Sequence, residues 1–187
     1  MDTLNQSEFT ASEKEDIVKM VDFFESKISV SGNDFNKPYK EFIQSLVNDG
    51  NSILDSTFNY EEQREMLTSI NANTKSEIWS KAKSRAFYSF NGEKLKEPIK
   101  YESLAISIDG KYIKLLDKIA KKDEKIKYYV TKAKEAGDFP MFYNLSGLLI
   151  GVDNKWVDFN EGHWRLIVSI QILTMLENDK RHMELAE

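Results

Sequence analysis

The stretch that decides the fold is Asn160–Leu176, NEGHWRLIVSIQILTML, near the carboxyl end of the 187-residue chain. From Trp164 onward, apolar side chains fall on nearly every face of a helix, and a helix that is apolar all round belongs inside a domain. Asn160 is the predicted N-cap, which places Phe159 and Trp164 as a hydrophobic staple. We therefore predict that a helix beginning near Asn160 forms the core, and that the polar residues from Glu177 onward are exposed.

A first helix is predicted near the amino terminus. Thr10 with Glu13, or Ser12 with Glu15, has the spacing of a capping box. Apolar residues at helical spacing follow as far as Ile28 and define the buried stripe of this helix.

Three further helices are predicted before residue 91. Pro38 suits a first helical turn and Gly50 suits a C-cap, so a second helix is expected between them. Asn59 is the predicted N-cap of a third helix, and Thr74 that of a fourth. The fourth is extended to residue 90 by apolar residues at a spacing of four: Ile78, Ala82, Ala86 and Phe90.

The middle of the chain allows two interpretations. The dipeptides 91–92 and 109–110, Asn-Gly and Asp-Gly, are typical of β-hairpin turns. Apolar residues from Leu104 to Ile119 nevertheless keep helical phase, which favours a helix over 101–121 with Gly92 as the C-cap of the preceding helix. A hairpin at either dipeptide is the alternative.

Two segments precede the core helix. Asp123 is the predicted start of a helix that ends at Gly137. Residues 145–150 are predicted to form either a short helix or a strand paired with 156–159.

These patterns predict an all-α fold. We expect a single domain over residues 1–187, in which about seven or eight helices form a bundle around the apolar C-terminal helix, with at most one small β-hairpin. Residues 1–9 and 178–187 are expected to be loose ends.

The residue content and the motifs of the sequence exclude several kinds of functional site. The chain has no cysteine, which excludes disulfides, cysteine nucleophiles and thiolate metal sites. It has no glycine-rich phosphate loop, no GxSxG and no HExxH motif, so we expect no cofactor and favour a protein without catalytic activity. No signal peptide and no bilayer-spanning stretch is evident, which favours a cytoplasmic protein, or a periplasmic one if a leader has been removed.

Charge is segregated along the chain although the net charge is −5. Residues 1–77 carry 15 acidic and 7 basic side chains, whereas residues 78–134 carry 7 acidic and 15 basic ones. Such a basic segment forms either a solvated surface that pairs with the acidic parts of the chain or a face that binds an anionic partner. The candidate partner-binding residues are Lys111, Lys114, Lys118, Lys121, Lys122 and Lys125.

The densest polar cluster in the sequence lies at 158–165. Asp158, Glu161 and His163 are weak candidates for acid–base chemistry or metal binding, because an imidazole beside a carboxylate is a usual base arrangement. The simpler interpretation is a helix start, where acidic residues cap the helix and complement its dipole. No second histidine stands at metal-ligand spacing, so no metal site is predicted.

The favoured function is a non-catalytic protein-binding module of bacterial or phage origin, such as a toxin-neutralising immunity protein or a small regulator. Segregated charge and the absence of catalytic motifs carry this prediction. One alternative is a small helical enzyme or ligand-binding protein that uses 158–165. The other is nucleic-acid binding through 78–134, which the scarcity of arginine and the net negative charge oppose.

Overall fold

The computed structural model describes residues 2–88 and 93–184. Within these ranges the chain is mostly helical, with nine α-helices, two short 3-10 helices and one two-stranded antiparallel sheet. The predominantly helical fold is therefore confirmed, and the described helices outnumber the seven or eight predicted.

The amino-terminal half is helical up to residue 78. Its elements are η1 (Asp2–Gln6), α1 (Ala11–Lys27), α2 (Asn36–Asp49), α3 (Ser52–Thr57), α4 (Tyr60–Ser69) and α5 (Ala72–Ile78). Thr10 and Glu13 form the reciprocal capping box that starts α1. Gly50 ends α2 with a φ of 64°, and Asn59 caps α4 by accepting two backbone N–H groups.

The second half contains a hairpin followed by four α-helices. Its elements are β1 (Trp79–Tyr88), β2 (Lys94–Ile106), α6 (Lys111–Ala120), α7 (Glu124–Ala136), α8 (Phe142–Ile150), η2 (Val152–Asn154) and α9 (Gly162–Met183). Asp123 caps α7, and Gly137 ends it in the left-handed conformation, as the sequence indicates. Residues 145–150 are helical, so the helix alternative is the right one for that segment.

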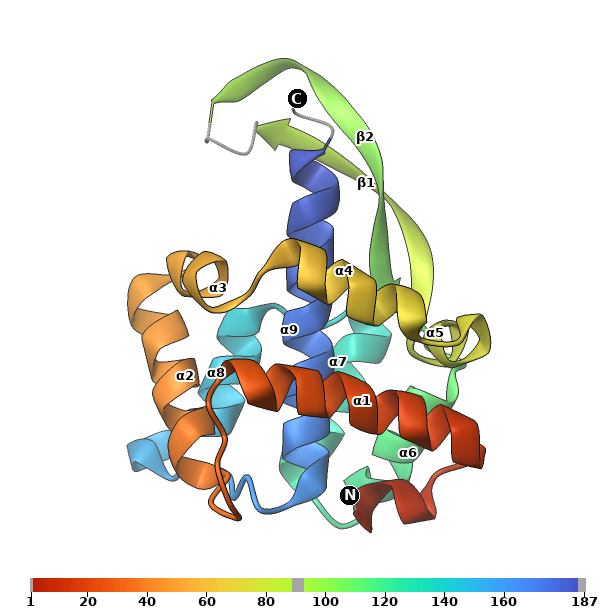
Figure 1. Ribbon diagram of the computed structural model, residues 1–187, viewed down its shortest axis with the longest axis vertical. Coiled ribbons are helices and arrows are strands. Elements are labelled where there is room, and N and C mark those ends of the chain that lie inside the picture. Colours follow the sequence, from red (N-terminus) through yellow and green to blue (C-terminus); the bar gives the residue numbers. More distant parts are fainter. Residues whose placement is uncertain (1, 89–92, 185–187) are drawn as a thin grey trace.

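Helix α9 has the most extensively buried apolar surface. Its residues from Trp164 to Leu173 are buried apart from Arg165, and the helix contacts η1, α1, α4 and β2. Figure 1 shows α9 running vertically, with α1 and α4 crossing in front of it, α7 behind it and α8 to its left. The apolar sequence of α9 is thus matched by neighbours on several sides.

The hairpin corrects two predictions. The predicted fourth helix ends at Ile78, after which β1 begins, and the predicted helix over 101–121 is strand β2 up to Ile106 and helix α6 only from Lys111. A spacing of four residues caused both errors, because four is close to one helical turn and is also a multiple of the two-residue period of a strand. The antiparallel pairing of β1 with β2 agrees with the hairpin alternative, and the dipeptide 91–92 itself lies outside the described residues.

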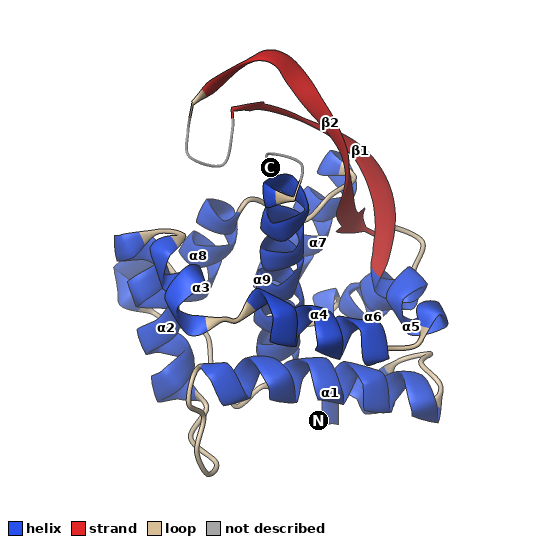
Figure 2. Ribbon diagram, turned by 45° about the horizontal axis from the view of Figure 1, so that its top comes forward, coloured by secondary structure: helices blue, strands red, loops and turns tan. Residues whose placement is uncertain are grey.

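The hairpin stands out from the helices. Figures 1 and 2 show it rising above α5 and arching over the carboxyl end of α9. Its root is fixed by the indole N–H of Trp79, which donates to Thr174 on α9 at 2.7 Å. Further along, the side-chain amide of Asn178 exchanges two hydrogen bonds with the backbone of Leu104, at 2.7 and 2.9 Å.

Both ends carry more structure than expected. Leu4 of η1 and Phe9 are buried, so residues 2–9 take part in the hydrophobic core. Helix α9 continues to Met183, and Glu177 is buried rather than exposed. The N-cap position of α9 is held by Glu161, one residue beyond the predicted Asn160.

Candidate functional site

The first candidate site lies at the start of α9. His163 is the second residue of that helix and Glu161 its N-cap. The His163 side chain is 15% exposed, and its ring lies beside Trp164 with the ring centroids 5.3 Å apart. The burial of Trp164 in the core thereby holds the neighbouring imidazole close to the body of the protein.

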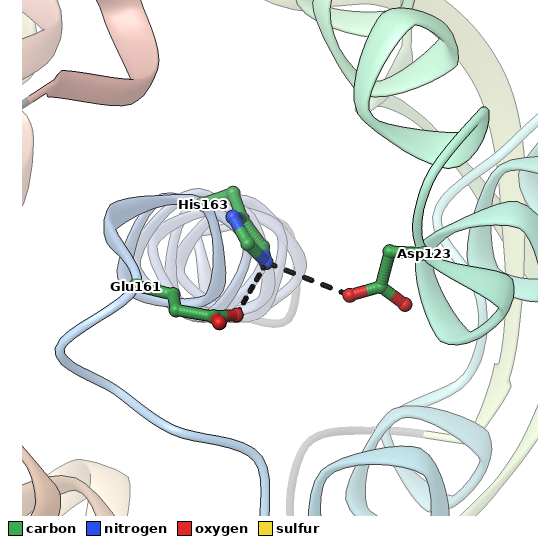
Figure 3. Close-up of side chains that lie close together, drawn as sticks. All are labelled: Asp123, Glu161 and His163. Carbon is green, nitrogen blue, oxygen red and sulfur yellow. Dashed lines mark ion pairs between the residues drawn. The ribbon is translucent and has the colours of Figure 1, made fainter.

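Asp123 meets this pair from another part of the chain. Its Oδ1 accepts the backbone N–H groups of Lys125 and Ile126, as the N-cap of α7. Its Oδ2 is left facing His163 Nε2 at 3.7 Å, while Glu161 Oε2 lies 3.2 Å from the same nitrogen. Figure 3 shows both carboxylates directed at this one ring nitrogen.

The sequence did not identify Asp123 as a member of this site. Asp158, the carboxylate proposed from the sequence, instead accepts hydrogen bonds from the Asn36 side chain and from the backbone and side chain of Asn160. These bonds lower the pKa of Asp158. Of the described residues that could ligate a metal, the one close group is Asp123, Glu161 and His163, whose ligand atoms lie within 4.8 Å of one another.

The imidazole of His163 has an unusual environment. Burial lowers its pKa, and the nearby charges of Glu161 and Asp123 only partly offset this effect. Its Nε2 atom is buried and has no hydrogen-bond partner among the residues that the structure describes.

The six lysines proposed for partner binding fall into two groups. Lys111 forms ion pairs with Glu13 at 2.8 Å and Glu77 at 3.7 Å, and Lys118 pairs with Glu8 at 2.9 Å. The ammonium group of Lys125 donates to the backbone carbonyl of residue 155 at 3.4 Å. The remaining three are exposed: Lys114, Lys121 and Lys122. Half of the proposed set thus makes contacts within the chain.

A second basic surface lies on the hairpin. Side chains alternate between the two faces of a strand, and residues paired across two strands share a face. The pairs Lys83–Glu102 and Arg85–Lys100 therefore project from one face, and all four of these residues are exposed. We call Lys83, Arg85 and Lys100 the outer hairpin cluster.

The opposite face of the hairpin is turned toward α9. It carries the buried residues Ala86, Ser103 and Ala105, and Tyr101, whose ring stacks on His182 of α9 with centroids 5.7 Å apart. Small side chains on this face let the ribbon lie close to the helix end.

On the face that carries the outer hairpin cluster, Trp79 and Ile106 are buried at the root of the hairpin, and Glu102 lies 3.8 Å from Arg181 of α9. The part of this face left exposed for a partner is therefore the outer hairpin cluster itself.

Comparison of the chain with family models, with curated proteins and with solved structures found no match. None of the helices in the described ranges has the length and apolar character needed to cross a bilayer.

Proposed function

We propose that the protein is a non-catalytic protein-binding module and that the outer face of hairpin β1–β2 docks an acidic protein partner. The observation that carries this proposal is the pairing of Arg85 with Lys100 directly across the two strands. Like charges in opposed positions destabilise a sheet by a few tenths of a kcal/mol up to about 1 kcal/mol. Acidic side chains of a partner would turn this repulsion into attraction.

Acidic residues of the chain do little to neutralise the positive charges of the outer hairpin cluster. Glu102, which faces Lys83, forms its ion pair with Lys81 at 2.7 Å and lies 3.8 Å from Arg181. Lys83, Arg85 and Lys100 form no ion pair with any residue in 2–88 or 93–184. This contrasts with Lys111 and Lys118, which acidic residues of the chain itself neutralise.

An exposed aromatic side chain extends the same surface. Phe87 lies two residues after Arg85 on the same face of β1 and is 56% exposed, whereas Tyr88 projects from the opposite face. Aromatic residues are enriched at protein interfaces because they bury a large area while retaining few rotamers. The position of Phe87 beside the outer hairpin cluster supports a docking surface with both apolar and electrostatic contacts.

The hairpin is better suited to bind a partner through its side chains than to pair its edge with a strand of the partner. Between the pairs Ala86–Ile99 and Tyr88–Lys94, four residues of β2 oppose one of β1, and Pro98 lies in this irregular stretch. A bulge and a proline both hinder another strand from forming backbone hydrogen bonds with the edge of a sheet. We therefore propose recognition by charge and aromatic contact.

The proposal includes the arrangement of the helices that support the hairpin. The burial of α9 and its contacts with η1, α1 and α4 support a bundle built around this helix. The bonds from Thr174 and Asn178 to the hairpin would then hold the docking surface on a rigid base.

A toxin-neutralising immunity protein or a small regulator of bacterial or phage origin is the kind of module that we propose. Segregated charge favours fast, electrostatically steered association, which both roles require. Lysine greatly outnumbers arginine in the chain, in keeping with an AT-rich genome.

The test is a quantitative pull-down from the native host with two charge-matched variants. The triple variant Lys83→Ser, Arg85→Ser, Lys100→Ser removes the outer hairpin cluster. The control, Lys114→Ser, Lys121→Ser, Lys122→Ser, removes three exposed lysines of α6 and the segment after it. We expect one protein to be retained by the wild type and the control but lost from the hairpin variant.

Two results would overturn the proposal. Loss of the partner from the control variant alone would move docking to the lysines around α6. Retention of nucleic acid in place of a protein, removed by nuclease and by 200 mM salt, would support the nucleic-acid alternative.

A further inference from the structure

We propose that Asp123, Glu161 and His163 form a binding site for a divalent transition-metal ion of the zinc type. The site is independent of the proposed docking surface. It joins the segment between α6 and α7 to the start of α9, two parts of the chain 40 residues apart.

The side chains are the right kind for such an ion. Zinc binds imidazole nitrogen and carboxylate oxygen at about 2.0–2.2 Å, so two ligand atoms of a tetrahedral site lie roughly 3.4 Å apart. The distances from His163 Nε2 to the oxygens of Glu161 and Asp123 are 3.2 and 3.7 Å, on either side of that value. Small rotations of the two carboxylates therefore suffice to close the site around an ion.

The imidazole nitrogen points to a ligand independently of the carboxylates. A buried polar atom without a hydrogen bond is costly, and such atoms in native structures call for a specific explanation. His163 Nε2 is one of four such side-chain atoms in the described residues, and it alone lies in a group able to ligate a metal. An imidazole nitrogen without a proton offers the lone pair that a metal ion requires.

The local charge also favours a cation. Asp123 and Glu161 are the N-cap residues of α7 and α9, and each helix start carries a partial positive charge of about half a unit. Two ionised carboxylates bring two negative charges, which outweigh the two helix starts by about one unit. This net negative charge attracts a cation. A divalent ion bound between the two carboxylates would more than neutralise it.

The geometry leaves room for a fourth ligand. Glu161 is 54% exposed, so one side of the group is open to solvent. Three protein ligands and a water molecule would complete a tetrahedral site. Because binding would link two distant segments, the ion should stabilise the folded chain.

The experiment titrates Zn²⁺ into chelator-treated protein by calorimetry and records thermal unfolding with and without the ion. We expect one ion per chain and, at hundredfold excess over the dissociation constant, a rise of about 5–10 °C in the midpoint. Glu161→Gln alters an exposed side chain, and Asp123→Asn keeps the capping oxygen, so both variants should fold. Each should weaken binding about tenfold or more, as should His163→Gln.

His182→Gln is the control, because it removes the other histidine and leaves the proposed site intact. Its affinity should equal that of the wild type. Three results would overturn the proposal: no binding at 100 μM Zn²⁺, weak binding of several ions that Glu161→Gln and Asp123→Asn leave unchanged, or loss of binding in His182→Gln.

Discussion

Arg85 and Lys100 stand directly opposite each other across the two strands of the hairpin, on its outer face. Both are exposed, and neither forms an ion pair with a residue that the structure describes. Such an arrangement costs folding free energy and is understandable as part of a surface that meets opposite charge.

Lys100→Glu should therefore separate stability from binding. Opposite charges would replace like charges at the Arg85 pair, which should raise the free energy of unfolding by about 0.2–1 kcal/mol in a urea titration. The same change should weaken capture of the proposed acidic partner. Lys122→Glu, an equal change of charge away from the hairpin, should leave capture unaltered. A Lys100→Glu protein that binds as well as the wild type would argue against the outer hairpin cluster.

Asn178 should control the attachment of the hairpin to α9. Its amide both donates to and accepts from the backbone of Leu104, so Asn178→Ala leaves two partly buried backbone groups unpaired. We expect a loss of about 1–3 kcal/mol in unfolding free energy and faster hydrogen exchange at the Leu104 amide. Asn178→Asp keeps the acceptor for that amide and should preserve its protection. Unchanged exchange in Asn178→Ala would show that other contacts hold the hairpin.

Asp179 should make stability depend on pH. Burial and the nearby charge of Asp55 raise its pKa to about 6, and the charge of His182 only partly opposes them. Burial is the main cause of the raised pKa values of Tyr60 and Tyr101, and the negative charge of Asp179 raises both further. Because the folded state holds this proton more tightly than the unfolded state, the contribution of Asp179 to stability falls as pH rises from about 4 to 6.

Asp179→Asn should remove the loss of stability that accompanies ionisation of Asp179. At pH 8 the variant should be more stable than the wild type by about 1–2 kcal/mol, a value reduced for partial solvent exposure. At pH 4 the difference should largely vanish. Urea titrations at the two pH values provide the measurement, and a difference that grows toward low pH would contradict the raised pKa.

Gly110 should be intolerant of a side chain. A Cβ atom there would lie 2.3 Å from the backbone oxygen of Glu77, so the start of α6 would have to move away from α5. Gly110→Ala should cost about 2 kcal/mol or more in thermal or urea unfolding. Gly147→Ala is the matched control, because its Cβ would meet no atom within 4 Å inside α8, and it should stabilise the protein by roughly 0.5–1 kcal/mol. Equal effects at both positions would contradict this packing argument.

The sequence predicted those helices whose ends are set by local chemistry. Thr10, Asn59 and Asp123 cap their helices through hydrogen bonds to residues two or three positions away, which a sequence pattern can capture. The hairpin was misjudged because its apolar residues recur every four positions, a spacing that fits both helix and strand. Strand pairing between Trp79 and Ile106 depends on contacts that no local pattern reveals.

The candidate site was predictable only in part. Glu161 and His163 are neighbours in the sequence and were found together, whereas Asp123 joins them through tertiary folding. Asp158 was assigned to the wrong cluster because its partner Asn36 is 122 positions away. For the lysines between 111 and 125, the sequence allows two interpretations: a solvated surface paired with the acidic parts of the chain, or a face for an anionic partner. Lys111 and Lys118 agree with the first, because their acidic partners lie in the first 77 residues.

The most direct test of the central claim is site-specific photocrosslinking in the native host. A benzophenone amino acid placed at Phe87, on the outer hairpin surface, is compared with the same amino acid at Lys122. We predict that the position on the hairpin gives one dominant adduct with an acidic protein, which Lys100→Glu abolishes, and that position 122 gives none. An adduct formed only from position 122, or no protein adduct at either position, would contradict docking through the hairpin.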